Sequence, residues 1–548
     1  MTTRLLRTAA ASVAAWLLAS CGGSSSATAE KAVPDSIAAV MAKTRYASAS
    51  SKWSLVVMDA KTGALVYALD PDRLAFTGSV RKLFSVATAL NSIGPDHRFT
   101  TSVHRSGTAT PQGALIGDLV LVGGGDLTFG GRAKPDGTLD YSDFDHNEAP
   151  AFGGAGLTPQ DPLAALNDLA RQVRAAGIRN VTGDVLVDDR LFDSFRVPNG
   201  NVLISPLSVN ENLIDVTVTP GLSVEDPALL DWRPKVSGFT VAGSSATTAS
   251  GSAADLFVSG DSLGNIGLSC LGVPGCRGLV SSAKSPAAGT IPVGYQAPLI
   301  GTSQFVGVLR AEDPPTLARI AFIDALARAG VNVNAPVVAK NQADRSPPGE
   351  TLGASTLLAA YVSPPYLEYA RLILKVSLNT GANLSLMHVG LSQGARTRET
   401  ALAAERRLLV DDLGLDPAGF DFPTNGSGSP DSRASARTTA KLAAAMTKRP
   451  GYAAYRQGLP LLGVDGSLAA IGRSVVGKEH IAAKSGATVD AEGNMAAISM
   501  AGYIDAKSGR ALTFALFVND AGPITDISDT LQVFEDQARI AGIVYEMN

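Results

Sequence analysis

Cysteine and histidine are both scarce in this chain, whose 548 residues include three cysteines and five histidines. Three cysteines are too few for a disulfide-stapled scaffold, and they form no zinc-ligand pattern. The histidines show no HExxH or other ligand spacing, and no Walker or dinucleotide-binding glycine pattern is present. We therefore expect neither a metal nor any other cofactor.

An excess of charge of one sign is also lacking, since 46 basic and 50 acidic side chains give a formal charge of -4. This balance offers no electrostatic footprint for nucleic acid. Hydrophobic residues make up 45% and charged residues 18%, which is typical of a globular chain and not of a disordered one. A chain of 548 residues is too long to fold around a single hydrophobic core, so more than one domain is expected.

The longest apolar run lies near the N-terminus. Two arginines precede the apolar stretch 8–20, which is shorter than the roughly 20 residues that cross a bilayer. This pattern predicts a signal peptide over residues 1–20. The stretch ends in Leu18-Ala19-Ser20-Cys21, which resembles the bacterial lipobox, and a polar tether over 21–34 follows. We expect Cys21 to be lipidated and to anchor an exported protein to the lipid bilayer; the alternative is ordinary secretory cleavage beside an unmodified cysteine.

The other two cysteines, Cys270 and Cys276, would face an oxidising environment after export. Five residues that include a Pro-Gly turn separate them, so they are a candidate disulfide pair. Its stabilisation would be modest because the closed loop is so short.

The two ends of the chain carry the elements of one antiparallel sheet. Strand candidates occur at 53–58, 64–69, 480–484, 495–504 and 511–518. A helical pattern follows Gly78, helical patterns dominate from about residue 355 up to the last three strand candidates, and a C-terminal helix follows those strands. We predict that 35–100 and 350–548 form one domain and that 101–349 is inserted, mostly β, with one helix from Pro162.

A serine followed three residues later by a lysine occurs twice, at Ser79 and at Ser281. One helical turn places the amine beside the hydroxyl, whose proton it can accept. Ser79 fits, because an amphipathic helix follows it and a helix N-terminus directs free N–H groups at developing negative charge. Ser281 lies in a Gly/Ser/Pro-rich stretch without a helix signal, so Ser79 and Lys82 are the predicted pair.

Two further motifs also occur in several copies. Lys-[Ser/Thr]-Gly begins at Lys61, at Lys507 and at Lys484. The first two copies lie between apolar runs and are predicted hairpin turns, whereas Lys484-Ser485-Gly486 ends an apolar run and is predicted to line a cleft. Of the two Ser-x-Asn copies, Ser208-x-Asn210 is predicted to open a strand, and Ser377-x-Asn379 joins two helical runs.

The segment 260–264 reads Gly-Asp-Ser-Leu-Gly, which matches the nucleophile-elbow string of esterases. An elbow needs a strand before it, a helix after it, and an acid and a histidine downstream. No helix signal follows, and the only Asp-x-x-His, from Asp143 to His146, lies upstream. We therefore reject an elbow at this segment.

Ser79-x-x-Lys82, Ser377-x-Asn379 and Lys484-Ser485-Gly486 occur in the chain order that is typical of penicillin-binding proteins and serine β-lactamases. With the stretches 119–126, 183–192, 425–429 and 463–468, the chain from about residue 40 resembles the class C low-molecular-mass penicillin-binding proteins, the D-alanyl-D-alanine carboxypeptidase/endopeptidase family. The resemblance implies an α/β (α+β) fold: a β-lactamase/transpeptidase-like domain whose five-stranded antiparallel sheet is flanked by helices and which is interrupted by inserted, mostly β domains.

The resemblance also implies a serine carboxypeptidase, with or without endopeptidase action, on the stem peptides of peptidoglycan. Ser79 would be acylated, and Lys82 would be its general base in the neutral form, which partial burial and the neighbouring cation of Lys484 favour. Ser377 would relay a proton to the leaving amine, and Asn379 would orient Lys82 and the substrate amide. β-Lactams are expected as covalent inhibitors.

Substrate binding is assigned on the same resemblance. Lys484 and Ser485 would hold the terminal carboxylate of the substrate. The backbone N–H groups of Ser79 and of Ala487, which follows Gly486, would form the oxyanion hole.

The sequence departs from the family pattern at three places. These departures leave the reacting groups intact and are expected to affect the reaction rate and the substrate preference. Ala487 stands where many relatives have threonine, Asn425 replaces a common aspartate, and the long polar segment 130–157 is expected to reshape the cleft.

Two alternatives to the carboxypeptidase function stay open. The first is a β-lactamase or esterase on the same scaffold, which the large insertion disfavours. The second is a non-catalytic peptidoglycan-binding or β-lactam-sensing module, which intact Ser79 and Lys82 disfavour.

Overall fold

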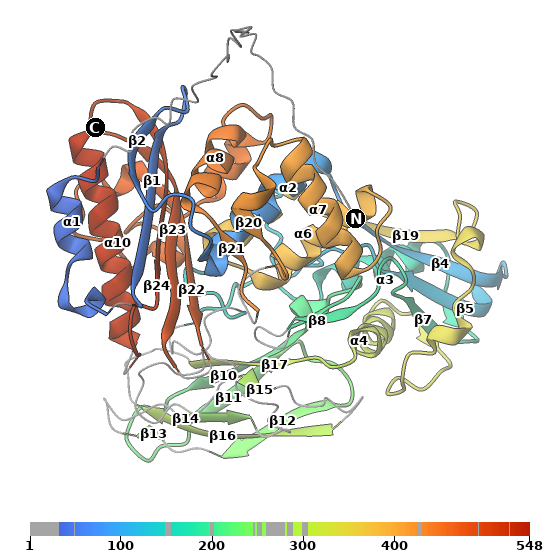
Figure 1. Cartoon of the computed structure of the whole chain (residues 1–548). Helices are drawn as coiled ribbons and strands as arrows, with labels where there is room; N and C mark the ends of the chain where they lie inside the picture. The colour runs from blue at the N-terminus through green and yellow to red at the C-terminus, as the bar shows by residue number, and fades with distance from the viewer. Residues whose placement is uncertain are drawn as a thin grey trace, which may run out of the picture.

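Both ends of the chain contribute to one antiparallel sheet (Figure 1). The computed structural model describes residues 32–48, 50–147, 155–197, 202–244, 247–248, 255–258, 280–281, 289–298, 305–425, 430–490, 493–524 and 527–548. The predicted signal peptide, Cys21, the pair Cys270 and Cys276, and the segment 260–264 lie outside the described residues.

The sheet has five strands in the order β2-β1-β24-β23-β22, and every neighbouring pair is antiparallel. The strands are β1 (Lys52–Asp59), β2 (Leu65–Leu69), β22 (Ile481–Val489), β23 (Met495–Asp505) and β24 (Ala511–Asn519). The inner strands are buried on both faces, because helices cover both sides. The predicted five-stranded antiparallel sheet flanked by helices is confirmed.

Helices from both halves of the sequence cover the two faces (Figure 1). Helices α1 (Asp35–Met41) and α10 (Ile527–Met547) pack on one face with a shared apolar core. The other face packs against a layer that surrounds the buried helix α2. This layer comprises α2 (Arg81–Ser92), α5 (Tyr366–Val376), α6 (Asn379–Ser392), α7 (Arg398–Asp411), α8 (Ala436–Met446) and α9 (Tyr452–Gly458). Helix α2 is therefore held between the sheet and the other helices, which fixes the residues at its N-terminus.

The chain leaves this part after α2 and returns beside the point of departure. Strand β4 (Thr100–Ala109) pairs antiparallel with β19 (Leu357–Val362), so the two crossings of the chain are neighbouring strands. They belong to a six-stranded sheet with β5 (Ala114–Val122), β6 (Asn180–Val181), β7 (Val185–Asp188) and β18 (Asn332–Val333). An insertion whose ends are adjacent can be accommodated without rearranging the sheet that carries the chain termini.

Two further sheets complete the inserted part (Figure 1). One comprises β10 (Leu213–Thr219), β11 (Leu229–Arg233), β15 (Val280–Ser281) and β17 (Phe305–Arg310). The other comprises β12 (Phe239–Ser244), β13 (Thr247–Thr248), β14 (Asp255–Val258) and β16 (Gly289–Pro298). The inserted part also contains the two-stranded pair β8 (Phe195–Val197) and β9 (Val202–Ile204). Outside it, β3 (Ala75–Phe76), β20 (Phe420–Asp421) and β21 (Arg433–Ala434) form a small three-stranded sheet.

The inserted part contains a second helix that the sequence did not predict. Besides the predicted α3 (Ala164–Ala175), it contains α4 (Pro314–Arg328), and the two helices pack together over the six-stranded sheet. Helix α4 is buried around most of its circumference and so lacks a 3.6-residue alternation of polar and apolar positions. Helix α4 was therefore missed, although Asp313 as N-cap and Pro314 at the first helical position are start signals that the sequence contains.

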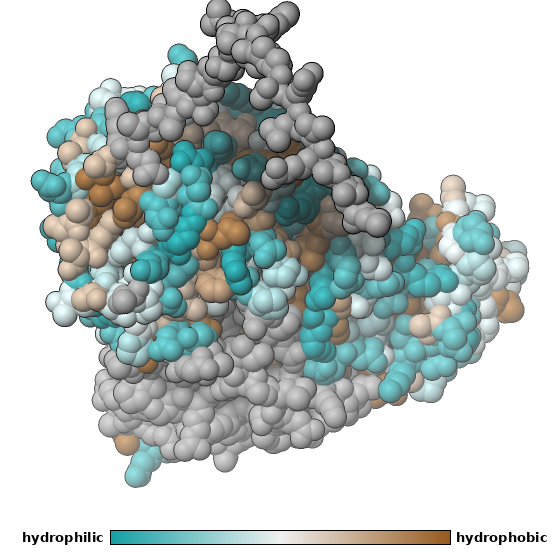
Figure 2. All heavy atoms as spheres, in the orientation of Figure 1, coloured by the Kyte–Doolittle hydropathy of each residue, from teal (hydrophilic) through white to brown (hydrophobic). Residues whose placement is uncertain are grey.

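Within the part of the chain that the structure describes, no helix combines the length and apolar character needed to cross a membrane. Figure 2 shows hydrophilic residues interspersed with apolar ones over the coloured surface of the face seen in Figure 1.

Candidate active site

The predicted nucleophile lies in a tight turn at the N-terminus of the central helix. Ser79 occupies the 3-10 turn Gly78–Val80, and α2 continues from it directly. The helical spacing brings Lys82 Nζ to 2.6 Å from Ser79 Oγ. Ser79 is 7% exposed and Lys82 is fully buried, so the hydroxyl is within reach of solvent while the amine is not.

Ser377 lies at the corner between α5 and α6. Its backbone is left-handed, with φ of 66°, and this geometry ends α5 and lets α6 begin at Asn379. A non-glycine residue in this region carries strain, and such strain is common at functional sites. The corner places Ser377 Oγ 3.3 Å from Lys82 Nζ, so one amine contacts both hydroxyls.

The predicted Lys484-Ser485-Gly486 segment lies on the edge strand β22, facing the nucleophile turn. Lys484 is fully buried, and its Nζ donates to the backbone O of Ser485 at 2.6 Å. Ser485 Oγ lies 3.2 Å from Ser467 Oγ. This strand and the turn at Ser79 therefore form two walls of one site.

The two walls approach so closely that glycine is required on each. A Cβ added at Gly486 would lie 2.6 Å from the backbone N of Ser79, and one at Gly78 would lie 2.8 Å from the backbone N of Ala487. Gly78 also has φ of 48°, in the left-handed region that glycine tolerates. The turn that carries Ser79 and the part of strand β22 that carries Ala487 are thus packed directly against each other.

A buried ion pair that the sequence did not reveal supports the nucleophile helix from behind. Arg81, between Ser79 and Lys82 in the motif, forms a bidentate pair with Glu405 of α7. Both side chains are almost completely buried. Asn425, which stands where many family members have aspartate, also stabilises these helices. It accepts a hydrogen bond from Ser85 of α2 and donates one to the backbone O of Ala382 on α6 at 2.7 Å. Helices α2, α6 and α7 are thereby tied together.

The segment 130–147 crosses from the inserted part to the active site. The backbone N of Leu139 donates to Glu368 of α5 at 3.0 Å, and Asp143 accepts a hydrogen bond from the backbone N of Gly466 at 2.6 Å. Asn147 donates to Thr380 Oγ1 at 3.0 Å, next to Asn379. The described part of the long polar segment therefore lies against the helices that carry the Ser-x-Asn motif.

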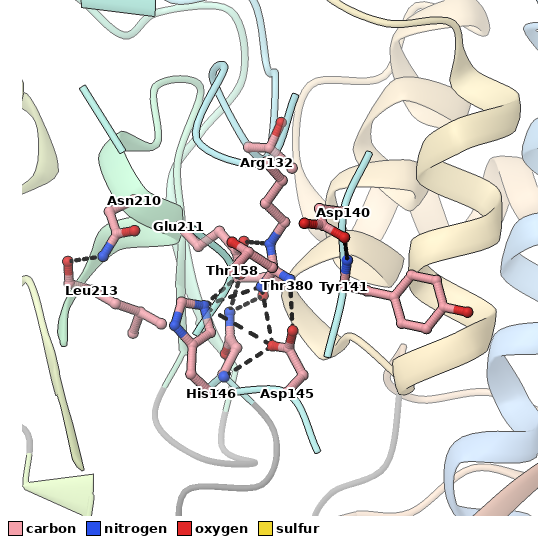
Figure 3. A network of polar contacts seen from close by, with 12 residues as sticks. Arg132, Asp140, Tyr141, Asp145, His146, Thr158, Asn210, Glu211, Leu213 and Thr380 are labelled. Carbon is pink, nitrogen blue, oxygen red and sulfur yellow. Dashed lines mark hydrogen bonds and ion pairs between the residues drawn. The ribbon is translucent and has the colours of Figure 1, made fainter. Parts of the chain in front are cut away.

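A buried network of charges holds this segment (Figure 3). Arg132 donates to both oxygens of Asp145, at 2.6 and 3.0 Å, and also contacts Glu211. Asn147 donates to the other oxygen of Glu211 at 2.7 Å. Burial opposes the ionisation of Glu211, but the Arg132 charge prevails and holds the pKa of this carboxyl well below its usual range. Residues Asn210, Glu211 and Asn212 all have positive φ, so the turn that presents Glu211 is strained.

The same network contains a set of potential metal ligands. Atoms of Asp145, His146 and Glu211 lie within 4.8 Å of one another. The guanidinium of Arg132 reaches both carboxylates and lies 3.0 Å from His146 Nε2 (Figure 3). The Arg132 guanidinium already pairs with both carboxylates. Burial opposes the charged form of His146, but Asp215 and Asp145 prevail and raise the pKa of its imidazole to about 10, so this ring is itself a cation. The set therefore fits an ion-pair network and not a metal site.

The other copies of the Ser-x-x-Lys and Lys-[Ser/Thr]-Gly motifs lie in other elements. Lys61 and Lys507 begin turns that close at Gly63 and Gly509, by hydrogen bonds of 2.9 and 2.8 Å back to Asp59 and Ala506. Ser281 belongs to the inserted strand β15. Ser208-x-Asn210 lies at the start of the 3-10 turn Val209–Asn212, directly before strand β10, and this turn belongs to the buried network that reaches Thr380. The copies at Ser79 and Ser377 meet at Lys82, and the copy at Lys484 lies on the strand that packs against the Ser79 turn.

Comparisons with known proteins agree with this architecture. The model of a family described as the D-Ala-D-Ala carboxypeptidase 3 (S13) family matches residues 35–273 and 300–538. A D-alanyl-D-alanine carboxypeptidase of Actinomadura sp. (strain R39) is 26% identical over 489 residues, which cover 86% of this chain and 78% of the relative.

Solved structures show the same fold. The crystal structure of penicillin binding protein 4 from Haemophilus influenzae has a TM-score of 0.65 at 15% identity, and the match covers 93% of this chain and 98% of that one. The same protein complexed with a β-lactam has a TM-score of 0.62 at 15% identity, with the same coverage.

Proposed function

The chain belongs to the D-Ala-D-Ala carboxypeptidase 3 (S13) family, and from this premise we propose that it cleaves the stem peptides of peptidoglycan through an acyl-enzyme on Ser79. The protein is a serine D-alanyl-D-alanine carboxypeptidase. The observation that carries the proposed assignment is the contact of Lys82 Nζ with Ser79 Oγ at 2.6 Å and with Ser377 Oγ at 3.3 Å.

Acylation begins when Ser79 Oγ attacks the carbonyl carbon of the D-Ala-D-Ala bond. Lys82, in its neutral form, takes the hydroxyl proton as the new C–O bond forms, and complete burial favours that neutral form. Negative charge on the carbonyl oxygen is stabilised by the backbone N–H groups of Ser79 and Ala487. Removing one such donor from a serine hydrolase typically lowers the rate about 100- to 1000-fold.

The peptide C–N bond then breaks and D-alanine leaves as the amine. Ser377 Oγ lies 3.3 Å from Lys82 Nζ, and this contact supports a role for Ser377 in passing the proton from the lysine to the leaving nitrogen. Asn379 orients Lys82 and the substrate amide. A water molecule then adds to the ester, with Lys82 as the base, and releases the shortened peptide and free Ser79.

Lys484 and Ser485 hold the terminal carboxylate of the substrate. A lysine in a dry wall of the cleft attracts a carboxylate more strongly than the same lysine in water, because the local dielectric is low. β-Lactams are covalent inhibitors on the same reasoning, since their carboxylate and strained amide fit the same groups.

The enzyme activity is tested by measuring D-alanine released from a pentapeptide ending in D-Ala-D-Ala, in parallel with turnover of a β-lactam. We expect release of D-alanine and slow loss of the β-lactam. Rapid β-lactam turnover without D-alanine release would instead indicate a β-lactamase.

We also propose that the protein is exported and anchored by a lipid on Cys21, because peptidoglycan lies outside the cytoplasm and the Leu-Ala-Ser-Cys pattern fits a lipobox. Mass spectrometry of the mature N-terminus tests the anchor. A diacylated Cys21 is expected, and an unmodified mature N-terminus would contradict it.

A further inference from the structure

Asp431 lies where the two walls of the active site meet. One oxygen of its carboxylate, Oδ2, accepts a hydrogen bond from the backbone N of Gly78 at 3.1 Å and another from Thr488 Oγ1 at 2.8 Å. Gly78 immediately precedes Ser79, and Thr488 immediately follows Ala487. A single oxygen atom therefore connects the two backbone segments whose N–H groups form the proposed oxyanion hole.

The carboxylate is itself fixed by its surroundings. The second oxygen, Oδ1, accepts from the backbone N of Ser432 at 2.8 Å. The backbone O of Ser432 accepts from both the N and the Oγ1 of Thr77, at 3.0 and 3.1 Å. Residues 431–432 thus hold Thr77–Gly78 by two backbone N–H groups and one side-chain hydroxyl, and Asp431 extends the connection to Thr488 of strand β22. Ser499 Oγ of β23 makes a separate connection, because it donates to the backbone O of Thr77 and of Gly486.

Burial makes this arrangement energetically costly for a carboxylate. Asp431 is 8% exposed, and burial raises the pKa of its carboxyl to about 6, against the opposing effects of its hydrogen bonds and of Lys82. The groups that face it are Lys82 from α2, Thr488 from β22, and the backbone of Gly78 and Ser432. A strongly perturbed carboxyl beside a nucleophile indicates a role in function more often than in packing.

We propose that Asp431 is a positioning residue for acylation: its carboxylate sets the spacing between the Ser79 and Ala487 N–H groups. This inference rests on the proposed function. Oxyanion stabilisation depends on donors that are fixed before the reaction, so a looser spacing lowers the rate of acylation more than the affinity for the ligand.

The test measures acylation by a fluorescent penicillin in stopped-flow, separating the reversible binding constant from the acylation rate constant. Asp431→Ala and Thr488→Val each remove one connection. We expect the acylation rate constant to fall about 100-fold in Asp431→Ala and about 10-fold in Thr488→Val, while the binding constant changes less than about threefold. Thr488→Ser keeps the hydroxyl and restores most of the rate.

The pH dependence of the acylation rate separates a positioning role from a structural one, because a loss of stability alone does not change this dependence. Protonation of Asp431 below about pH 6 removes an acceptor lone pair, whereas an asparagine at this position does not titrate. We expect the ratio of the wild-type rate to the Asp431→Asn rate to fall as the pH drops through about 6.

Asp184→Asn is the matched control, because Asp184 is equally buried but pairs with Arg319 in the inserted part. It lowers thermal stability and leaves acylation per folded molecule unchanged. Acylation within threefold of wild type in Thr488→Val, or a pH-independent ratio for Asp431→Asn, would overturn the inference. Absence of any adduct on the wild-type enzyme would instead refute the proposed function.

Discussion

Individual lysines in this protein differ in role because of their surroundings, although the tripeptides around them are alike. Lys484-Ser485-Gly486 lies on a buried strand beside the nucleophile, whereas Lys507-Ser508-Gly509 forms an exposed hairpin turn. Burial removes water from Lys484 and so strengthens its attraction for a carboxylate. The same side chain in the turn at Lys507 is solvated and interacts weakly with any anion.

Lys484→Met is therefore expected to lower kcat/KM for a D-Ala-D-Ala pentapeptide at least 100-fold. The methionine keeps the length and packing of the side chain but cannot bind the terminal carboxylate. Lys507→Met, which changes the same residue type in the same tripeptide motif, should leave kcat/KM within about twofold. Equal effects of the two substitutions on steady-state kinetics would contradict the assigned role of Lys484.

Residues that position the reacting groups are harder to recognise than the reacting groups themselves. Ser79, Lys82 and Ser377 belong to short motifs whose local helical context can be read from the sequence. Asp431 belongs to no such motif, and its contact with Gly78 spans 353 residues of chain. Only the fold brings these two together, so the sequence alone gives no signal for this contact.

At the scale of elements, the close contact between strand β22 and the turn Gly78–Val80 determines the geometry of the site. Assigning the strand candidates at the two ends of the chain to one sheet identified its five members, although not their order. Strand β2 and helices α3 and α5 follow their 2- and 3.6-residue patterns. Helix α4 does not, because it is buried on nearly all sides. Patterns of alternation report one buried face, and they fail where both faces are buried.

Gly486→Ala tests the contact between these two elements. The new methyl group would lie within 2.6 Å of the Ser79 N and the Thr77 O, so strand and turn must separate. We expect acylation by penicillin to slow about 100-fold, since the oxyanion donors move apart. Gly353→Ala is the control, because nothing lies within 4 Å of its added Cβ and its backbone φ is not in the left-handed region. A rate for Gly486→Ala equal to that of the control would exclude tight packing here.

At the scale of the whole molecule, a charged network connects the inserted part to the active-site helices. Arg132, Asp145 and Glu211 are almost completely buried, and Asn147 continues the network to Thr380 of α6. Removing one partner of a buried ion pair typically costs about 3–5 kcal/mol, because the other charge is left unpaired. The network is therefore expected to contribute to the stability of the junction between the two parts.

The stability of this junction should depend on pH through Glu211. Its pKa in the folded protein is depressed, so its contribution is fully present above the ordinary value of 4.5 and is lost as the pH falls below it. Glu211→Gln has no carboxyl group to titrate at this position, and its Tm is expected to be lower than that of wild type above pH 4.5. We expect the Tm difference between wild type and Glu211→Gln to narrow below about pH 4.5. The corresponding difference in the free energy of unfolding should shrink by roughly 1.4 kcal/mol per pH unit. Calorimetry at one scan rate checks this.

The exposed Glu479 provides the control for that experiment. Glu479→Gln should give the same Tm as wild type at each pH between 3 and 7. A Tm difference for Glu211→Gln that stays constant over this range would show that Glu211 keeps its proton affinity on folding, and would contradict the assigned ion pair.

The central claim is that Ser79 forms an acyl-enzyme, and intact-protein mass spectrometry after incubation with a fluorescent penicillin tests it most directly. The wild-type enzyme should gain the mass of one penicilloyl group, located on the proteolytic peptide that contains Ser79, and Ser79→Ala should gain none. A wild-type protein that stays unmodified, or an adduct of the same stoichiometry on Ser79→Ala, would contradict the account.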